Sequence, residues 1–106
     1  MKEKIKNQFR QGDVLVERTQ SIPANAAKQP AMERVILAHG EVTGHAHAIE
    51  GTATSWLSGG QAVAVRVNRP TKIVHQEHAP VPLRRGMYRV IRQREYAPES
   101  IRNVAD

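Results

Sequence analysis

The chain has 106 residues, 40% of them hydrophobic and 25% charged, which is typical of a folded protein with one hydrophobic core and excludes a disordered chain. It contains no cysteine, which excludes disulfide bonds, thiolate metal ligands and cysteine nucleophiles. Its formal net charge of +6, from 16 Lys and Arg against 10 Asp and Glu, is compatible with a polyanionic partner such as nucleic acid or an acidic protein but does not decide for one.

In chain order, short apolar runs alternate with turn signals about every 8–12 residues, and the periodicity of helices is weak. Strands are expected over residues 14–18, 33–39, 41–49, 52–57, 61–67, 71–75 and 87–96. The strands over 41–49 and 52–57 are expected to form a hairpin across Glu50-Gly51, because glycine is common in tight turns. The pattern also predicts a surface loop over 21–30 and a short C-terminal helix over 99–105.

Many short strands separated by turns predict an all-β fold, either a small β-barrel or a β-sandwich, with a short C-terminal helix. We expect one domain over residues 1–106, in which residues 1–10 form a flexible N-terminal segment. No stretch approaches the roughly 20 apolar residues of a membrane span, and no signal peptide is evident. A soluble, cytoplasmic protein with no membrane contact is therefore expected, and the sequence leaves open whether it forms a homo-oligomer.

Four of the five histidines fall in two pairs, His45 with His47 and His75 with His78. Alternate residues of a strand point to the same face, so the first pair places two imidazoles about 6–7 Å apart at Cα, where they can chelate one ion. A barrel that closes on itself can bring the second pair opposite the first. His39, at the end of a predicted strand, is a possible further member of this group.

We therefore predict one divalent transition metal bound by His45, His47, His75 and His78. Imidazoles with nearby carboxylates suit Zn, Fe, Mn, Ni or Cu rather than Ca or Mg. An enzyme of this kind would use the metal as a Lewis acid or to activate water, with Glu50 or Glu77 as a ligand or general base. The sequence leaves open a metal that only ties two strands together, and histidines that bind no metal at all.

The segment G-E-V-T-G-H-A-H-A-I-E over residues 40–50 resembles the first metal motif of the cupin superfamily, in which a glycine precedes H-x-H and a glutamate follows. His45, His47 and Glu50 match that motif by residue type, although Glu50 follows His47 by three residues instead of four or five. The downstream histidine pair precedes the proline- and glycine-containing segment that a cupin places before its last histidine. The resemblance implies a small β-barrel with a histidine metal site. Longer phrases of the chain resemble small uncharacterised bacterial and phage proteins, which implies no activity.

The C-terminal third is rich in arginine, with five arginines in eleven residues: Arg84, Arg85, Arg89, Arg92 and Arg94. Beside Tyr88 and Tyr96, such side chains can bind phosphates and stack on bases, as in single-strand binders. We therefore take Arg84, Arg85, Arg92 and Arg94 as candidate nucleic-acid contacts. The alternative function is a non-enzymatic accessory factor that binds nucleic acid or protein, for example a phage-encoded inhibitor. A simpler interpretation keeps Tyr88 in the core and leaves the arginines solvated.

Overall fold

The computed structural model describes residues 7–40 and 44–92, and all regular secondary structure in these ranges is β. The strands are β1 (Gln8–Gln11), β2 (Val14–Arg18), β3 (Ala27–Lys28), β4 (Met32–His39), β5 (Ala46–Ser58), β6 (Gln61–Val67), β7 (Thr71–Val74), β8 (Val81–Leu83) and β9 (Gly86–Arg92). The all-β prediction is confirmed within these ranges, which hold no membrane-spanning helix. The helix predicted over 99–105 lies outside the described residues.

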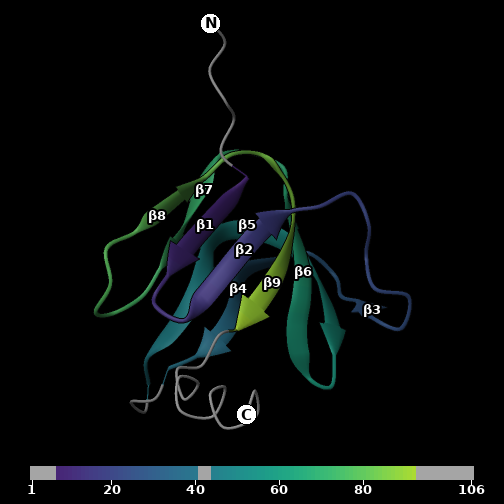
Figure 1. Ribbon diagram of the computed structural model, residues 1–106, viewed down its shortest axis with the longest axis horizontal. Helices are drawn as coiled ribbons and strands as arrows, with labels where there is room; N and C mark the ends of the chain where they lie inside the picture. The colour runs from purple at the N-terminus through teal and green to yellow at the C-terminus, as the bar shows by residue number, and fades with distance from the viewer. Residues whose placement is uncertain (1–6, 41–43, 93–106) are drawn as a thin grey trace, which may run out of the picture.

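The strands form one antiparallel sheet that curls into a nearly closed barrel (Figure 1). Along the sheet the order is β1-β2-β9-β6-β5-β7-β8, while β3 and β4 pair with β5 off this path. The first and last strands of that order, β1 and β8, contact one another. The sheet therefore curls until its two ends meet, which fits the predicted barrel.

Side chains help to close this barrel at two places where strands lie close without pairing. From β1, Gln11 donates its two amide N–H groups to the carbonyl oxygens of Ile73 in β7 (3.0 Å) and of Ala79, in the segment between β7 and β8 (2.9 Å). On the other side, Nη2 of Arg92 donates to the carbonyl oxygens of Leu37 (2.7 Å) and Ala62. Arg92 at the end of β9 thus joins β4 to β6.

The hairpin predicted across Glu50-Gly51 is wrong, because both residues lie inside the longest strand, β5. The chain continues through these residues as one strand, and Gly51 has a φ of +103°. Before Gly51, β5 pairs with β7, as in Glu50↔Lys72; beyond it, β5 pairs with β6, as in Ala53↔Val67. Because β4 pairs with β5 on both sides of Gly51, β7 and β6 must follow one another along the opposite edge. The glycine therefore marks a change of strand partner instead of a chain reversal.

The core fills the barrel, and the buried side chains of β2 alternate as the sequence predicts, whereas β5 buries consecutive residues over 46–49 and 53–55. Val14 and Val16 of β2, and Val65 and Val67 of β6, are almost completely buried. The largest fully buried side chain is Tyr88 of β9, whose ring packs edge-on against Phe9 with centroids 6.0 Å apart. Its hydroxyl donates to the carbonyl oxygen of Arg84 at 2.7 Å.

Other strands differ from the expected ones at their ends. The sequence pattern placed residues 8–10 in the N-terminal segment, whereas they belong to β1, which pairs with β2 across the turn at Gly12. Within the predicted loop over 21–30 lies the two-residue strand β3. Pro82 lies inside β8, which is possible because β8 is the last strand of the sheet order and an edge strand tolerates a missing N–H donor.

Two substitutions of Tyr88 separate its packing from its hydrogen bond. Tyr88→Phe removes the hydrogen bond to the carbonyl oxygen of Arg84 and should lower the free energy of unfolding by about 1 kcal/mol. Tyr88→Ala also removes the ring from the core and should lower it by about 3–5 kcal/mol. Urea denaturation measures both values, and equal losses for the two variants would contradict the placement of Tyr88 in the core.

Candidate metal centre

The strand β5 carries the histidine that lies deepest in the barrel. His47 shares the inner face of β5 with Ile49 and is 2% exposed. Glu50, three residues beyond His47, falls on the opposite face because side chains alternate along a strand. There its carboxylate pairs with Nζ of Lys72 at 3.5 Å. The structure therefore does not bring Glu50 to the histidines.

The segment between β7 and β8 brings the second histidine pair to the first. His75 directly follows β7, and His78 lies three residues further along. Gln76 anchors this segment to the start of β5: its Oε1 accepts from the backbone N–H of Ala46 (2.9 Å), and its Nε2 donates to the carbonyl oxygen of Gly44 (3.2 Å). This predicted approach of the two pairs is what the structure shows.

Three imidazoles form a compact group that we call the histidine triad: His47, His75 and His78. One ligand nitrogen from each ring lies within 4.8 Å of the others. The ring centroids of His47 and His75 are 4.3 Å apart, and those of His75 and His78 are 4.6 Å apart. His47 is buried and His78 exposed, so the triad extends from the barrel interior to the surface.

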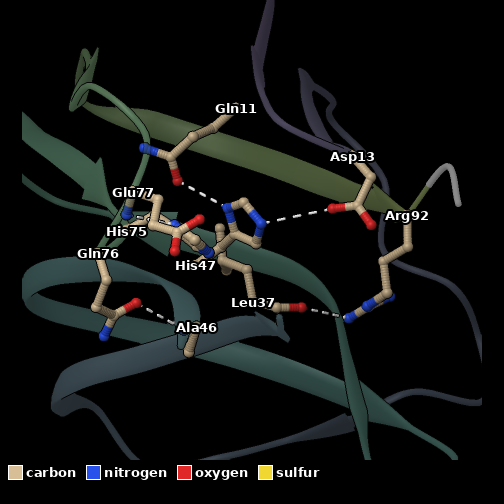
Figure 2. Close-up of polar contacts among 9 residues, drawn as sticks. All are labelled: Gln11, Asp13, Leu37, Ala46, His47, His75, Gln76, Glu77 and Arg92. Atoms are coloured by element: carbon tan, nitrogen blue, oxygen red, sulfur yellow. Dashed lines mark hydrogen bonds and ion pairs between the residues drawn. The ribbon is translucent and has the colours of Figure 1, made fainter. Parts of the chain in front are cut away.

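His45 and Glu77 lie beside the triad. The ring of His45 packs edge-on against His75 with centroids 5.6 Å apart, and its Nδ1 is 3.5 Å from Oε2 of Glu77. The backbone N–H of Glu77 donates to Nδ1 of His75 at 2.9 Å (Figure 2). His39, at the exposed end of β4, is not part of the metal-ligating group found in the described residues.

Gln11 fixes which nitrogen of His47 carries the proton. Its Oε1 lies 2.8 Å from Nδ1 of His47 (Figure 2). Because both amide N–H groups of Gln11 already donate to the carbonyl oxygens of Ile73 and Ala79, its oxygen must face the imidazole. An amide oxygen can only accept, so Nδ1 of neutral His47 carries the hydrogen and Nε2 keeps its lone pair. A lone pair on one nitrogen and an oriented N–H on the other is the usual state of a metal-ligating histidine.

The surroundings keep two of the imidazoles neutral. Burial, followed by the proximity of His75, lowers the pKa of His47 from 6.5 to about 4, although Asp13 opposes the shift. Burial and the neighbouring His78 and His45 lower the pKa of His75. Neutral imidazole is the form that binds metals.

Among the described candidates for nucleic-acid binding, Arg84 and Arg85 precede β9 and Arg92 lies at its far end. Arg92 is engaged by the carbonyl oxygens of β4 and β6, and Arg89 pairs with Glu17 at 2.6 Å. Arg84 and Arg85 are exposed between β8 and β9, and Arg94 lies outside the described residues. Nucleic-acid binding by this set stays a prediction.

Sequence reasoning missed three residues near the histidines, Gln11, Asp13 and Gln76. Gln11 and Asp13 flank the turn between β1 and β2, some 35 positions before His47, and each contacts that imidazole. The only signal in the sequence is the pair Gly12-Asp13, a turn signal directly before the strand expected over 14–18. A buried glutamine has no spacing pattern, so only the closed barrel reveals it.

The model of a family described as "Domain of unknown function (DUF8820)" matches residues 10–93, a range that includes the triad, Gln11 and Asp13. No cupin family matches, and the outward direction of Glu50 differs from the cupin arrangement that the resemblance implied. A comparison with curated proteins and with solved structures found no match.

The lowered pKa of His47 predicts a pH-dependent stability for the metal-free protein. Between about pH 6.5 and pH 4 the unfolded chain binds a proton at this histidine and the native protein does not, so stability rises with pH across this window. The shift from 6.5 to about 4 corresponds to about 3 kcal/mol. Urea denaturation in EDTA at several pH values should show a shallower dependence for His47→Gln than for wild type. Identical dependence would contradict the buried, neutral imidazole, and His39→Gln serves as the exposed control.

Proposed function

Because the chain belongs to the DUF8820 family, whose description names no function, we propose from the site alone that this protein binds one divalent transition-metal ion through His47, His75 and His78. The observation that carries the proposal is the approach of three imidazole nitrogens to within 4.8 Å of one another. They come from two segments about thirty residues apart in sequence, and no hydrogen bond among the three rings explains why they gather.

The triad is close to the dimensions of a metal site. Two ligands at about 2.0–2.2 Å from one ion, at the tetrahedral angle, lie roughly 3.3–3.6 Å apart. Ligand atoms within 4.8 Å must therefore approach by roughly 1 Å. His47 is fixed by Gln11, whereas His78 is exposed on the segment between β7 and β8, so His78 can supply most of this movement.

Binding would also change the hydrogen bond of His75. In the structure its Nδ1 accepts from the backbone N–H of Glu77, which places the ring proton on Nε2. Ligation through Nδ1 removes this acceptor, and ligation through Nε2 moves the proton to Nδ1, where it faces the Glu77 N–H. Either route breaks the bond, so metal binding and a shift of the Glu77 amide must occur together.

The ligand chemistry suits Zn, Fe, Mn, Ni or Cu, all of which accept neutral imidazole. Three protein ligands leave a fourth position, and what fills it decides between two roles. Water or substrate there would allow Lewis-acid or hydrolytic chemistry. Of the two carboxylates that the sequence suggested as general base, Glu50 and Glu77, only Glu77 lies beside the triad. A protein side chain there would make the metal structural.

Single histidine substitutions test the proposal. Untagged wild-type protein at pH 7.5 should bind one zinc ion per chain, and His75→Ala or His78→Ala should weaken binding at least about tenfold, because even outer partners of metal ligands contribute that much. His39→Ala should bind as wild type does. Isothermal titration calorimetry gives the affinity and elemental analysis the stoichiometry.

The proposal fails if wild-type protein retains none of the five metals, or if the His75 and His78 variants bind zinc as tightly as wild type. A nuclear magnetic resonance spectrum gives a second readout, because the amide signal of Glu77 should shift on metal addition.

A further inference from the structure

The turn between β1 and β2 forms a wall of the histidine triad. Gln11 contacts Nδ1 of His47, and the two following residues also face the imidazoles. Gly12 has a φ of +60°, and a Cβ atom at this position would lie 2.8 Å from Nε2 of His78 and 3.2 Å from Cε1 of His47. Another residue here would be strained by the positive φ and would have to displace the His78 ring, so glycine suits this close approach. The turn is therefore fitted to the histidines.

Asp13 places a carboxylate oxygen against the ligating nitrogen of His47. Its Oδ1 lies 3.5 Å from Nε2 (Figure 2), which is longer than an ordinary N–H···O hydrogen bond of about 2.7–3.2 Å. Since Gln11 holds the ring proton on Nδ1, the Nε2 lone pair faces a carboxylate that also offers only lone pairs. Such a pair of acceptors is favourable when a cation lies between them. The separation of 3.5 Å falls within the roughly 3.3–3.6 Å expected for two ligands of one tetrahedral ion.

We infer that Asp13 supplies the fourth metal ligand, so that the triad and one carboxylate close a tetrahedral site. This rests on the proposed function, and it deepens that function by assigning the open position. Four protein ligands are typical of structural metal sites, whereas catalytic sites keep one position for water or substrate. The ion would then join three segments, the β1–β2 turn, β5 and the segment between β7 and β8, at the place where the ends of the sheet meet.

The carboxylate must move to complete such a site, because the ligand atoms that lie within 4.8 Å of one another are those of His47, His75 and His78 without Asp13. The side chain of Asp13 is 36% exposed and that of His47 only 3%, so Asp13 can adjust from the surface toward a nitrogen that is fixed. Asp13 also balances charge: three neutral imidazoles and one carboxylate leave a divalent ion with a net charge of +1, beside a group of histidines that would repel one another if protonated.

Cobalt(II) distinguishes a closed from an open site, because its visible absorption is intense in four-coordinate tetrahedral sites and changes when an added anion enters the coordination sphere. Wild-type protein loaded with Co²⁺ should show the intense spectrum, and azide should not alter it. Asp13→Ala should bind Co²⁺ at least about tenfold more weakly, and azide should change its spectrum because an open position now exists. Asp13→Asn, which preserves the shape of the turn, should show the same weaker binding and the same response to azide. It replaces the alanine variant as the test if that variant folds poorly.

Glu50→Gln is the matched control, because this carboxylate lies near His47 in sequence but on the outer face; it should match wild type in affinity and spectrum. If the Asp13 variants bind Co²⁺ with wild-type affinity and spectrum, or if azide alters the wild-type spectrum, the inference is overturned while the proposed metal site stands. If wild-type protein binds neither Co²⁺ nor Zn²⁺, the proposed function itself fails.

Discussion

The side-chain amide of Gln11 is the interaction on which the site and the closure of the barrel both depend. Its N–H groups donate to Ile73 and Ala79, which flank the segment bearing His75 and His78, and its oxygen accepts from His47. One 2%-exposed residue therefore fixes the position of that segment and the protonation of the deepest histidine. Because all three contacts use the same planar amide, a movement of His47 would also disturb the contact of β1 with β7 and the segment that follows it.

This arrangement explains why the histidines are held near one another without mutual hydrogen bonds. Burying an imidazole costs free energy, and His47 avoids much of the cost by remaining neutral and donating to Gln11. Protonated neighbours would repel one another, which is reflected in the lowered pKa values of His47 and His75. His47 and His75 therefore present neutral nitrogens close together, an arrangement that favours a cation at the centre of the group.

The sequence predicted the parts of this protein that depend on local pattern. Alternating valines gave β2 and β6, and turn signals gave the all-β class, because strand alternation and tight turns are encoded by neighbouring residues. Gly51 was misread because glycine permits both a reversal and a bend within a strand, and only pairing with β4, β6 and β7 distinguishes the two. The histidine pairs were found by spacing, and their approach by the expectation of a barrel. Gln11 and Asp13 were missed because their contacts join positions far apart in sequence. Glu50 was misassigned because it follows His47 by three residues, and an odd spacing places two side chains on opposite faces of a strand.

The central claim is that one metal ion lies among His47, His75 and His78. A crystal structure of metal-loaded protein, with anomalous diffraction recorded on either side of the metal's absorption edge, tests it most directly. The account predicts one strong anomalous peak about 2.0–2.2 Å from a nitrogen of each of these three imidazoles, with the Glu77 amide no longer bonded to His75. The claim would be contradicted if metal-soaked crystals showed an ordered triad without such a peak, or if the peak lay on other residues.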